Sequence, residues 1–154
     1  LRRPEHENHE LIGEGTFEGC LGAMELTPQE KTRYTHKLPG PQCGHEGKPT
    51  YRIKSATKFE NWWYDHHISD IDKTSFAVYR TIYFKDAEKI KTVEIDWQPL
   101  EQPDPRITYP RYIYAVSHSD GKESMVYVPR STITLNVDLP DSFWSETTLK
   151  GYRR

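Results

Sequence analysis

The chain has 154 residues, of which 34% are hydrophobic and 12% aromatic, and its formal net charge is −2 at pH 7. Mixed charges in this balance exclude an electrostatic argument for nucleic acid or an anionic membrane as the partner. No apolar run approaches the ~20 residues of a membrane-spanning helix. The length suits one domain, but the few aliphatic residues predict a thin core, filled by aromatic side chains and by packing against another chain.

The two ends of the sequence are polar. Residues 1–10 are predicted to form an extended arm, residues 11–148 a single β-rich domain, and residues 149–154 a C-terminal tail. The first residue is Leu1 rather than Met, as expected after removal of a secretory or organellar leader or in a partial sequence. We expect partner proteins to hold both ends, in an extracellular, cell-surface or organellar setting.

Two cysteines, Cys20 and Cys43, lie in the glycine-rich first third of the chain. In an oxidising compartment they would form a disulfide that closes a loop of about two dozen residues and contributes ~3 kcal/mol. In a reducing compartment both would be free thiols.

Two helix-start patterns precede the strands. Thr27-Pro-Gln-Glu30 combines an N-cap, a first-turn proline and a capping-box glutamate, and predicts a short helix. Thr57-Lys-Phe-Glu60 repeats the capping box. It is followed by Phe59, Trp62, Trp63 and His66, whose spacing of three and four residues suits one helical face. The pattern predicts a short aromatic helix from about Lys58 to His66.

The stretch from Ser75 to Leu139 is predicted to form five antiparallel strands, because polar and apolar residues alternate along it. The strands are expected at residues 75–84, 89–97, 111–119, 122–129 and 131–139. Four prolines between residues 99 and 110 predict a connection that stays outside a central ladder. Residues 38–49 are predicted to be a loop and residues 65–73 a polar connection.

The third and fourth predicted strands form the clearest hairpin. Asp120-Gly121 is a preferred pair for a two-residue type I′ turn. Folding about this pair places Val116 opposite Met125 and Tyr114 opposite Tyr127.

Catalytic motifs are incomplete in this sequence. Residues 11–19 are similar to a kinase glycine loop, but Glu18 replaces the third glycine and the other kinase motifs are missing. We therefore interpret this segment as a flexible loop. Neither a nucleophile elbow nor a Cys-x-x-Cys pair occurs. No catalytic residue and no cofactor are predicted.

One group of side chains suits a metal ion, because imidazole and carboxylate ligate several divalent cations. Its members are Asp65, His66, His67, Asp70 and Asp72. The group lacks the His-Glu-x-x-His spacing and the glycine and terminal glutamate of an EF-hand loop. The favoured interpretation is a solvated turn, and a metal-dependent enzyme remains an alternative.

Aromatic side chains are the candidate contacts for a partner or a ligand, because their rings stack on sugars and pack into protein interfaces. The candidates are Trp62, Trp63, Tyr109, Tyr112, Tyr114 and Tyr127. A carbohydrate is a possible ligand for the same rings.

Residues 15–84 resemble the leading part of fibro-slime domains, which are relatives of PA14-type β-sandwich modules. The matching pieces are Thr16-Phe-Glu18 before a glycine, Gly47-Lys-Pro49 with Tyr51, and the segment from Ser55 to Asp65. The family's later Phe-Phe-Pro and Gly-Asp-Asp-Asp segments have no counterpart, so no calcium or sugar site is carried over. The resemblance implies a β-sandwich of extracellular or cell-surface type.

Together these patterns predict a mostly β protein, an antiparallel β-sandwich or half-open barrel with one short aromatic helix. The predicted function is that of a non-catalytic structural or accessory subunit in a larger multi-protein assembly. One alternative is a secreted or cell-surface carbohydrate-binding module. The other is the metal-dependent enzyme.

Overall fold

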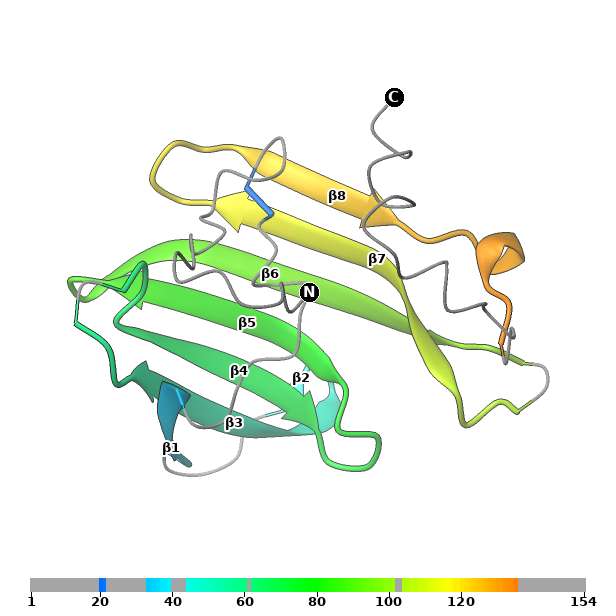
Figure 1. Cartoon of the computed structure of the whole chain (residues 1–154). Helices are drawn as coiled ribbons and strands as arrows, with labels where there is room; N and C mark the ends of the chain where they lie inside the picture. Colours follow the sequence, from blue (N-terminus) through cyan, green and yellow to red (C-terminus); the bar gives the residue numbers. More distant parts are fainter. Residues whose placement is uncertain (1–19, 22–32, 40–43, 61, 102–103, 136–154) are drawn as a thin grey trace, which may run out of the picture.

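A computed structural model describes residues 20–21, 33–39, 44–60, 62–101 and 104–135. These residues form eight β-strands and one short 3₁₀ helix, η3 (Figure 1). The elements are β1 (Tyr34–Lys37), β2 (Gly44–His45), β3 (Lys48–Thr57), β4 (His66–Asp72), β5 (Val78–Lys85), β6 (Glu88–Pro99), β7 (Thr108–Ser117), β8 (Glu123–Tyr127) and η3 (Arg130–Thr132).

The strands form one curved antiparallel sheet in the order β1-β3-β4-β5-β6-β7-β8, with β2 beside β3 (Figure 1). The sheet stays open, because β1 and β8 lie at opposite edges. The prediction of a mostly β, antiparallel fold is therefore confirmed. The two-layer sandwich is not, since the described strands make a single sheet.

The β5–β6 hairpin forms between two strands that the sequence predicted, at residues 75–84 and 89–97. Asp86 and Ala87 have φ values of 49° and 65° and connect the paired residues Lys85 and Glu88. Positive φ at both central residues is the geometry of a type I′ turn, whose twist matches that of the two strands.

The β7–β8 hairpin forms with a register two residues away from the predicted one. Tyr114 lies opposite Met125 and Tyr112 opposite Tyr127. The loop is longer than two residues, because the Ser117 backbone N–H donates to the Lys122 carbonyl and closes a four-residue connection. A shift of two residues leaves every side chain on its expected face.

The predicted aromatic helix from Lys58 to His66 is wrong. Thr57 is the last residue of β3, and its backbone N–H donates to the Asp65 carbonyl, which closes the segment as a loop. The Thr57 hydroxyl accepts a bond from the Phe59 N–H inside that loop instead of capping a helix. His66 is already the first residue of β4.

Residues 65–73 are not merely a polar connection, because residues 66–72 form β4, a strand paired on both sides. The loop predicted over residues 38–49 likewise contains β2 and the start of β3. Pro99 and Pro110 lie within the β6–β7 ladder. Pro110 is tolerated there because β8 pairs with β7 only from Tyr112 onward, so that side of β7 needs no donor at Pro110.

The fifth predicted strand, over residues 131–139, is wrong in its described part. Pro129 begins a turn in which its carbonyl accepts from the Thr132 N–H, and Arg130–Thr132 form η3. Residues 136–139 lie outside the described residues, as do the glycine loop at 11–19, the Thr27–Glu30 helix and both terminal segments.

The Cys20–Cys43 disulfide is also wrong, because Cys20 is a free and buried thiol. Its Sγ donates to the Ala115 carbonyl at 3.1 Å, and its backbone N–H donates to Ser124 Oγ at 2.7 Å. Cys43 itself lies outside the described residues.

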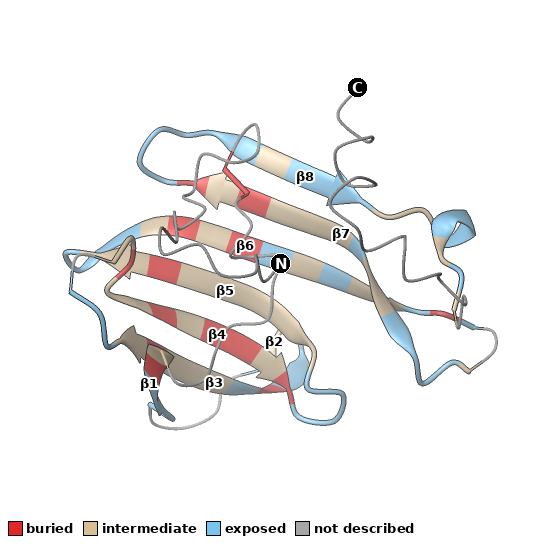
Figure 2. Cartoon of the chain, viewed as in Figure 1, coloured by how far each residue is buried: buried red, intermediate tan, exposed pale blue. Residues whose placement is uncertain are grey.

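The core lies on one face of the sheet. Its buried members are Cys20, Leu21, Tyr64, Tyr83, Val93 and Ala115. Figure 2 shows most of the buried positions on β4 to β7, and on β5 to β7 they lie toward one end of the strands. No helix within the described ranges has the length and apolar character needed to cross a membrane.

Candidate functional site: one sheet face with a polar and an apolar row

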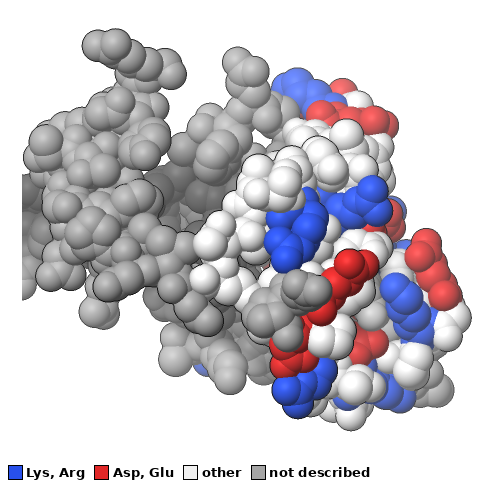
Figure 3. Space-filling model, turned by 90° about the vertical axis from the view of Figure 1, so that its right-hand side faces the viewer, with Lys and Arg blue, Asp and Glu red and all other residues white. Residues whose placement is uncertain are grey.

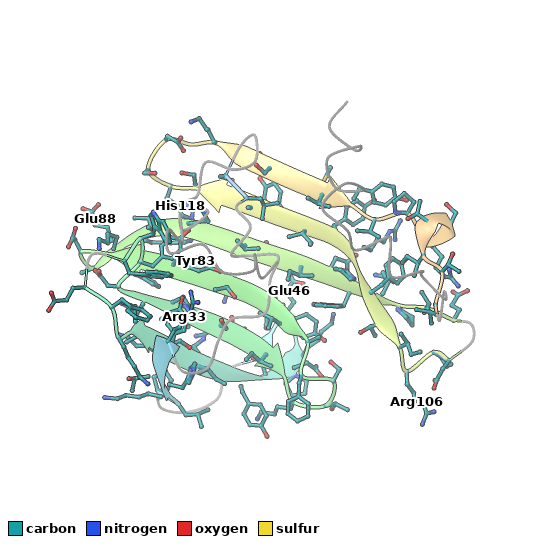
Figure 4. All side chains as sticks on the ribbon, viewed as in Figure 1. Arg33, Glu46, Tyr83, Glu88, Arg106 and His118 are labelled. Carbon is teal, nitrogen blue, oxygen red and sulfur yellow. The ribbon has the colours of Figure 1, made fainter. Side chains whose placement is uncertain are left out.

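We call the face that carries the core the core face and the opposite one the outer face. On the core face, strand pairing aligns side chains from neighbouring strands into rows. One of these, the polar row, runs from β1 to β7. It contains His36, Ser55, His67, Tyr83, Lys91 and Ser117, each a register partner of the next. In Figure 4, Tyr83 lies between Arg33, beside β1, and His118, in the β7–β8 loop.

The polar row is buried from Ser55 to Ser117, although most of these members are polar, whereas His36 at its β1 end is exposed. Lys91 is only 4% exposed, and its Nζ donates to the Tyr64 hydroxyl at 3.1 Å. Tyr64 packs on Tyr83 with 4.4 Å between ring centroids. A buried cation needs such polar contacts, because a charge transferred out of water without them is strongly destabilising.

His67 is neutral at pH 7. Its ring lies 5.1 Å from that of Tyr34, edge to face. Burial, and then the charges of His36 and His66, lower the pKa of His67 to about 4. The imidazole is therefore uncharged in the polar row.

A second row, the apolar row, lies toward the other ends of the strands. It contains Tyr51, Ile71 and Val78 on β3 to β5, and Ile95, Ile113 and Val126 on β6 to β8. Trp97 connects the two halves, because its Nε1 donates to the Val78 carbonyl at 2.8 Å.

The apolar row is less covered than the polar row. Tyr51 is 36% exposed and Val126 37%, and the other four members are half-buried. This order of burial is the reverse of the usual one, since apolar surface contributes about 25 cal/mol per Å² when it leaves water. Contiguous apolar surface that stays accessible is typical of binding sites.

The outer face is stabilised by ion pairs. Asp70 on β4 is 2% exposed and lies between Arg52 on β3 and Arg80 on β5, with closest nitrogen–oxygen distances of 2.7 Å to each. Burial opposes ionisation of Asp70, but hydrogen bonds from Arg52 and Arg80 hold its pKa below the usual value. This carboxylate is fully engaged.

The five candidate metal ligands are not brought together. Asp65 pairs with Lys85, and His66 stacks on Phe84 on the outer face with 4.7 Å between ring centroids. His67 lies on the core face, and Asp70 is held by its two arginines. No cluster of three or more His, Cys, Asp and Glu side chains suited to a metal occurs in the part of the chain that the structure covers.

The predicted aromatic contacts separate into two places. Tyr112 and Tyr127 stack at 5.0 Å on the outer face of β7–β8, where Tyr114 also lies. Tyr109 lines a cavity of about 230 Å³ with Arg111 and Arg130. Trp62 and Trp63 pack edge to face at 4.8 Å in the β3–β4 loop.

The sequence interpretation missed the rows because they cross six strands and depend on the register between them. One signal was present: His66 to Asp72 alternates in the same way as its neighbours if serine and histidine are accepted as core residues.

No protein-family model matches this chain, and no curated protein matches it by sequence. Solved structures do match it by fold. An outer membrane lipoprotein-sorting protein domain from Vibrio parahaemolyticus has a TM-score of 0.69 at 13% identity, over 90% of this chain and 58% of the other. A DUF1329 family protein from Desulfovibrio piger has a TM-score of 0.63 at 14% identity, over 84% and 52%.

A LolA superfamily protein from Nitrosomonas europaea has a TM-score of 0.57 at 12% identity, over 88% of this chain and 60% of the other. The chain therefore spans somewhat more than half the length of the structures that it resembles. At these identities the likeness shows a common fold.

These similarities correct the predicted function. A structural or accessory subunit of an assembly and a carbohydrate-binding module are both wrong, because the similar structures are a lipoprotein-sorting domain and a LolA superfamily protein. The resemblance to fibro-slime domains stays an untested prediction, and the structure contains one sheet where that resemblance implied a sandwich.

Proposed function

We propose that this protein binds the acyl chain of a lipid or of a lipidated protein along the apolar row of its core face. The role is binding, without a chemical step. The observation that carries the proposal is the reversed burial of that face. The polar row is buried from Ser55 to Ser117, whereas Tyr51 and Val126 of the apolar row are 36% and 37% exposed.

The dimensions of the apolar row suit such a ligand. The row crosses β3 to β8, which are neighbours in one sheet. At a strand spacing of about 4.8 Å, the six strands extend over about 24 Å. An extended hydrocarbon chain lying across the strands would contact one apolar side chain from each.

The similar structures support the same ligand class. One of them is a lipoprotein-sorting domain, and a lipoprotein carries acyl chains attached to its polypeptide. A protein that sorts such molecules has to shield those chains from water, because every exposed methylene group is unfavourable by about 0.8 kcal/mol.

The test is equilibrium binding of a fluorescent fatty acid to the purified chain and to two variants of β8. Val126→Gln changes the core face, and Met125→Gln changes the outer face of the same strand, where Met125 is 65% exposed. We expect Val126→Gln to weaken binding about fivefold, as the loss of ~1 kcal/mol of apolar contact implies. Met125→Gln should stay within about twofold of the original chain.

A stronger pair of variants tests the middle of the row. Ile95→Gln with Ile113→Gln should abolish binding, whereas Ile68→Gln with Ile82→Gln on the outer face should preserve it, provided that circular dichroism shows both folded. All four isoleucines are half-buried strand residues, but Ile95 and Ile113 also pack against the core cluster, so the check of folding is essential for that pair. Equal losses in both pairs, or no binding by the original chain, would refute the proposal.

A further inference from the structure

The β4–β5 loop, residues 73–77, presents a phenylalanine to solvent. Phe76 is 69% exposed, the largest exposure of any large hydrophobic side chain among the described residues. Its φ is 59°, in the left-handed region that bulky residues rarely adopt. Figure 2 shows this loop as exposed. Neither the exposure nor the backbone strain stabilises the fold, so both indicate a role outside it.

The loop is held in one conformation by Asp72, the last residue of β4. Asp72 Oδ1 accepts bonds from the Thr74 N–H at 2.9 Å, the Ser75 N–H at 2.7 Å and Ser75 Oγ at 3.0 Å. Its Oδ2 accepts from the Tyr79 hydroxyl at 3.1 Å. The Phe76 N–H donates to the Asp72 carbonyl at 3.2 Å. These bonds fix the position from which the Phe76 ring projects.

One basic and one aromatic side chain, Lys73 and Tyr51, lie together at the base of this loop. The Nζ of Lys73 lies 5.3 Å from the ring centroid of Tyr51, which is 36% exposed. Lys73 is exposed. Its acidic neighbour in the chain, Asp72, is buried and accepts hydrogen bonds from within the loop. Tyr51 also begins the apolar row, so the loop stands at the same end of the strands as that row.

We propose that Phe76, Tyr51 and Lys73 form a contact with the surface of an anionic lipid bilayer. A phenylalanine ring inserts at the boundary between headgroups and acyl chains, and a tyrosine ring lies at the headgroup level. A lysine beside them attracts anionic headgroups. The net charge of −2 does not attract the protein to an anionic bilayer. Figure 3 shows basic and acidic side chains interspersed on that side of the molecule. The affinity for the bilayer therefore has to come from Phe76, Tyr51 and Lys73 together.

The test is co-sedimentation of the purified chain with vesicles of phosphatidylcholine containing phosphatidylglycerol. Phe76→Gly removes the ring and relieves the positive φ, so the variant should fold at least as well as the original chain. We expect its vesicle partition to fall about tenfold, as loss of one buried aromatic side chain implies. The matched control is Phe59→Gly, at the opposite end of β4, where Phe59 is 49% exposed. It should stay within about twofold.

Lys73→Gln separates charge from insertion. Its partition should fall about fivefold on vesicles with phosphatidylglycerol and stay unchanged on pure phosphatidylcholine. The proposal is overturned if the original chain does not sediment with vesicles, or if Phe59→Gly loses as much binding as Phe76→Gly. It is also overturned if Phe76 instead mediates self-association, seen as a dimer that Phe76→Gly dissociates.

This inference shares Tyr51 with the acyl-chain proposal, but the measurements keep the two separate. Phe76→Gly should bind the fluorescent fatty acid normally in solution without vesicles. Val126→Gln should partition onto vesicles like the original chain. Either proposal can therefore fail while the other holds.

Discussion

The two faces of this sheet are built from alternate residues of the same strands, yet they are stabilised in different ways. On the outer face, Asp70 lies between Arg52 and Arg80, and its oxygens are engaged by guanidinium groups. On the core face, Lys91 is buried beside the Tyr64 hydroxyl and His67 is buried against aromatic rings, while nearby isoleucines are half-buried. On the core face, buried polar side chains therefore lie beside the buried Val93 and Ala115, whereas the apolar row is only partly covered.

The adjacent residues His66 and His67 show the same contrast. His66 stacks on Phe84 on the outer face and is half-buried. His67 is buried on the core face, against Tyr34 and Tyr83. Two consecutive histidines of β4 thus have different surroundings, because His66 is partly exposed to solvent and His67 is buried.

The substitution expected to lower the unfolding free energy most lies on the outer face. Asp70→Ala removes the carboxylate shared by Arg52 and Arg80 and leaves two guanidinium groups side by side. Removal of one partner of a buried ion pair destabilises a protein by about 3–5 kcal/mol, and the partial exposure of both arginines favours the lower end. Urea unfolding at neutral pH measures the loss. An unfolding free energy within about 1 kcal/mol of the original would show that the cluster contributes little.

The second largest effect is a loss of folding stability at acidic pH, caused by His67 on the core face. The pKa of His67 in the folded chain, about 4, lies below its ordinary value of 6.5. As pH falls below 6.5 the unfolded chain takes up a proton first, so stability decreases until pH reaches about 4. The difference corresponds to about 3 kcal/mol. Urea unfolding at pH 7 and pH 4 should show this loss.

The control for the pH prediction is a pair of glutamine variants. His67→Gln should remove most of the decrease between pH 7 and pH 4. His66→Gln should remove less, because its imidazole is only half-buried and its lowered pKa has the same main cause, burial, to a smaller extent. If both variants lost the same unfolding free energy between pH 7 and pH 4, the proposed difference between His66 and His67 would be contradicted.

A smaller loss of unfolding free energy is expected when the Tyr64 hydroxyl beside the polar row is removed. Tyr64→Phe keeps the ring against Tyr83 but removes the hydroxyl that accepts from Lys91 Nζ. Loss of one acceptor for a buried charged group should lower the unfolding free energy by about 1–2 kcal/mol. Tyr112→Phe on the outer face is the matched control, with a change below about 0.5 kcal/mol. A neutral Tyr64→Phe would mean that Lys91 does not depend on this hydroxyl.

The sequence predicted the sheet best where alternation was strong. Strands β5 to β8 were expected near their observed positions, because Val93 and Ile95 alternate with polar residues and turn residues separate the strands. Strand β4 was not predicted, because its core-face residues include His67 and Ser69. These are polar residues, which a sequence pattern assigns to solvent-exposed positions. Their partners, Tyr83 and Thr81, come from another strand.

Other errors arose where tertiary contacts overrode local signals. The capping box at Thr57 and the aromatic spacing after it satisfy helix rules, but Thr57 is already committed to β3 through pairing with Tyr34. The apolar row was beyond prediction for a related reason. Its members come from six different strands, and only the register between strands places Ile95 beside Ile113 and Val126.

Methyl NMR during a fatty-acid titration tests the central claim most directly, because isoleucines mark both faces of the sheet. We expect the Ile95 and Ile113 signals to shift in proportion to bound ligand while those of Ile68 and Ile82 stay in place. Shifts on the outer face alone, or no shift at any of the four, would contradict the assignment of the core face as the lipid site.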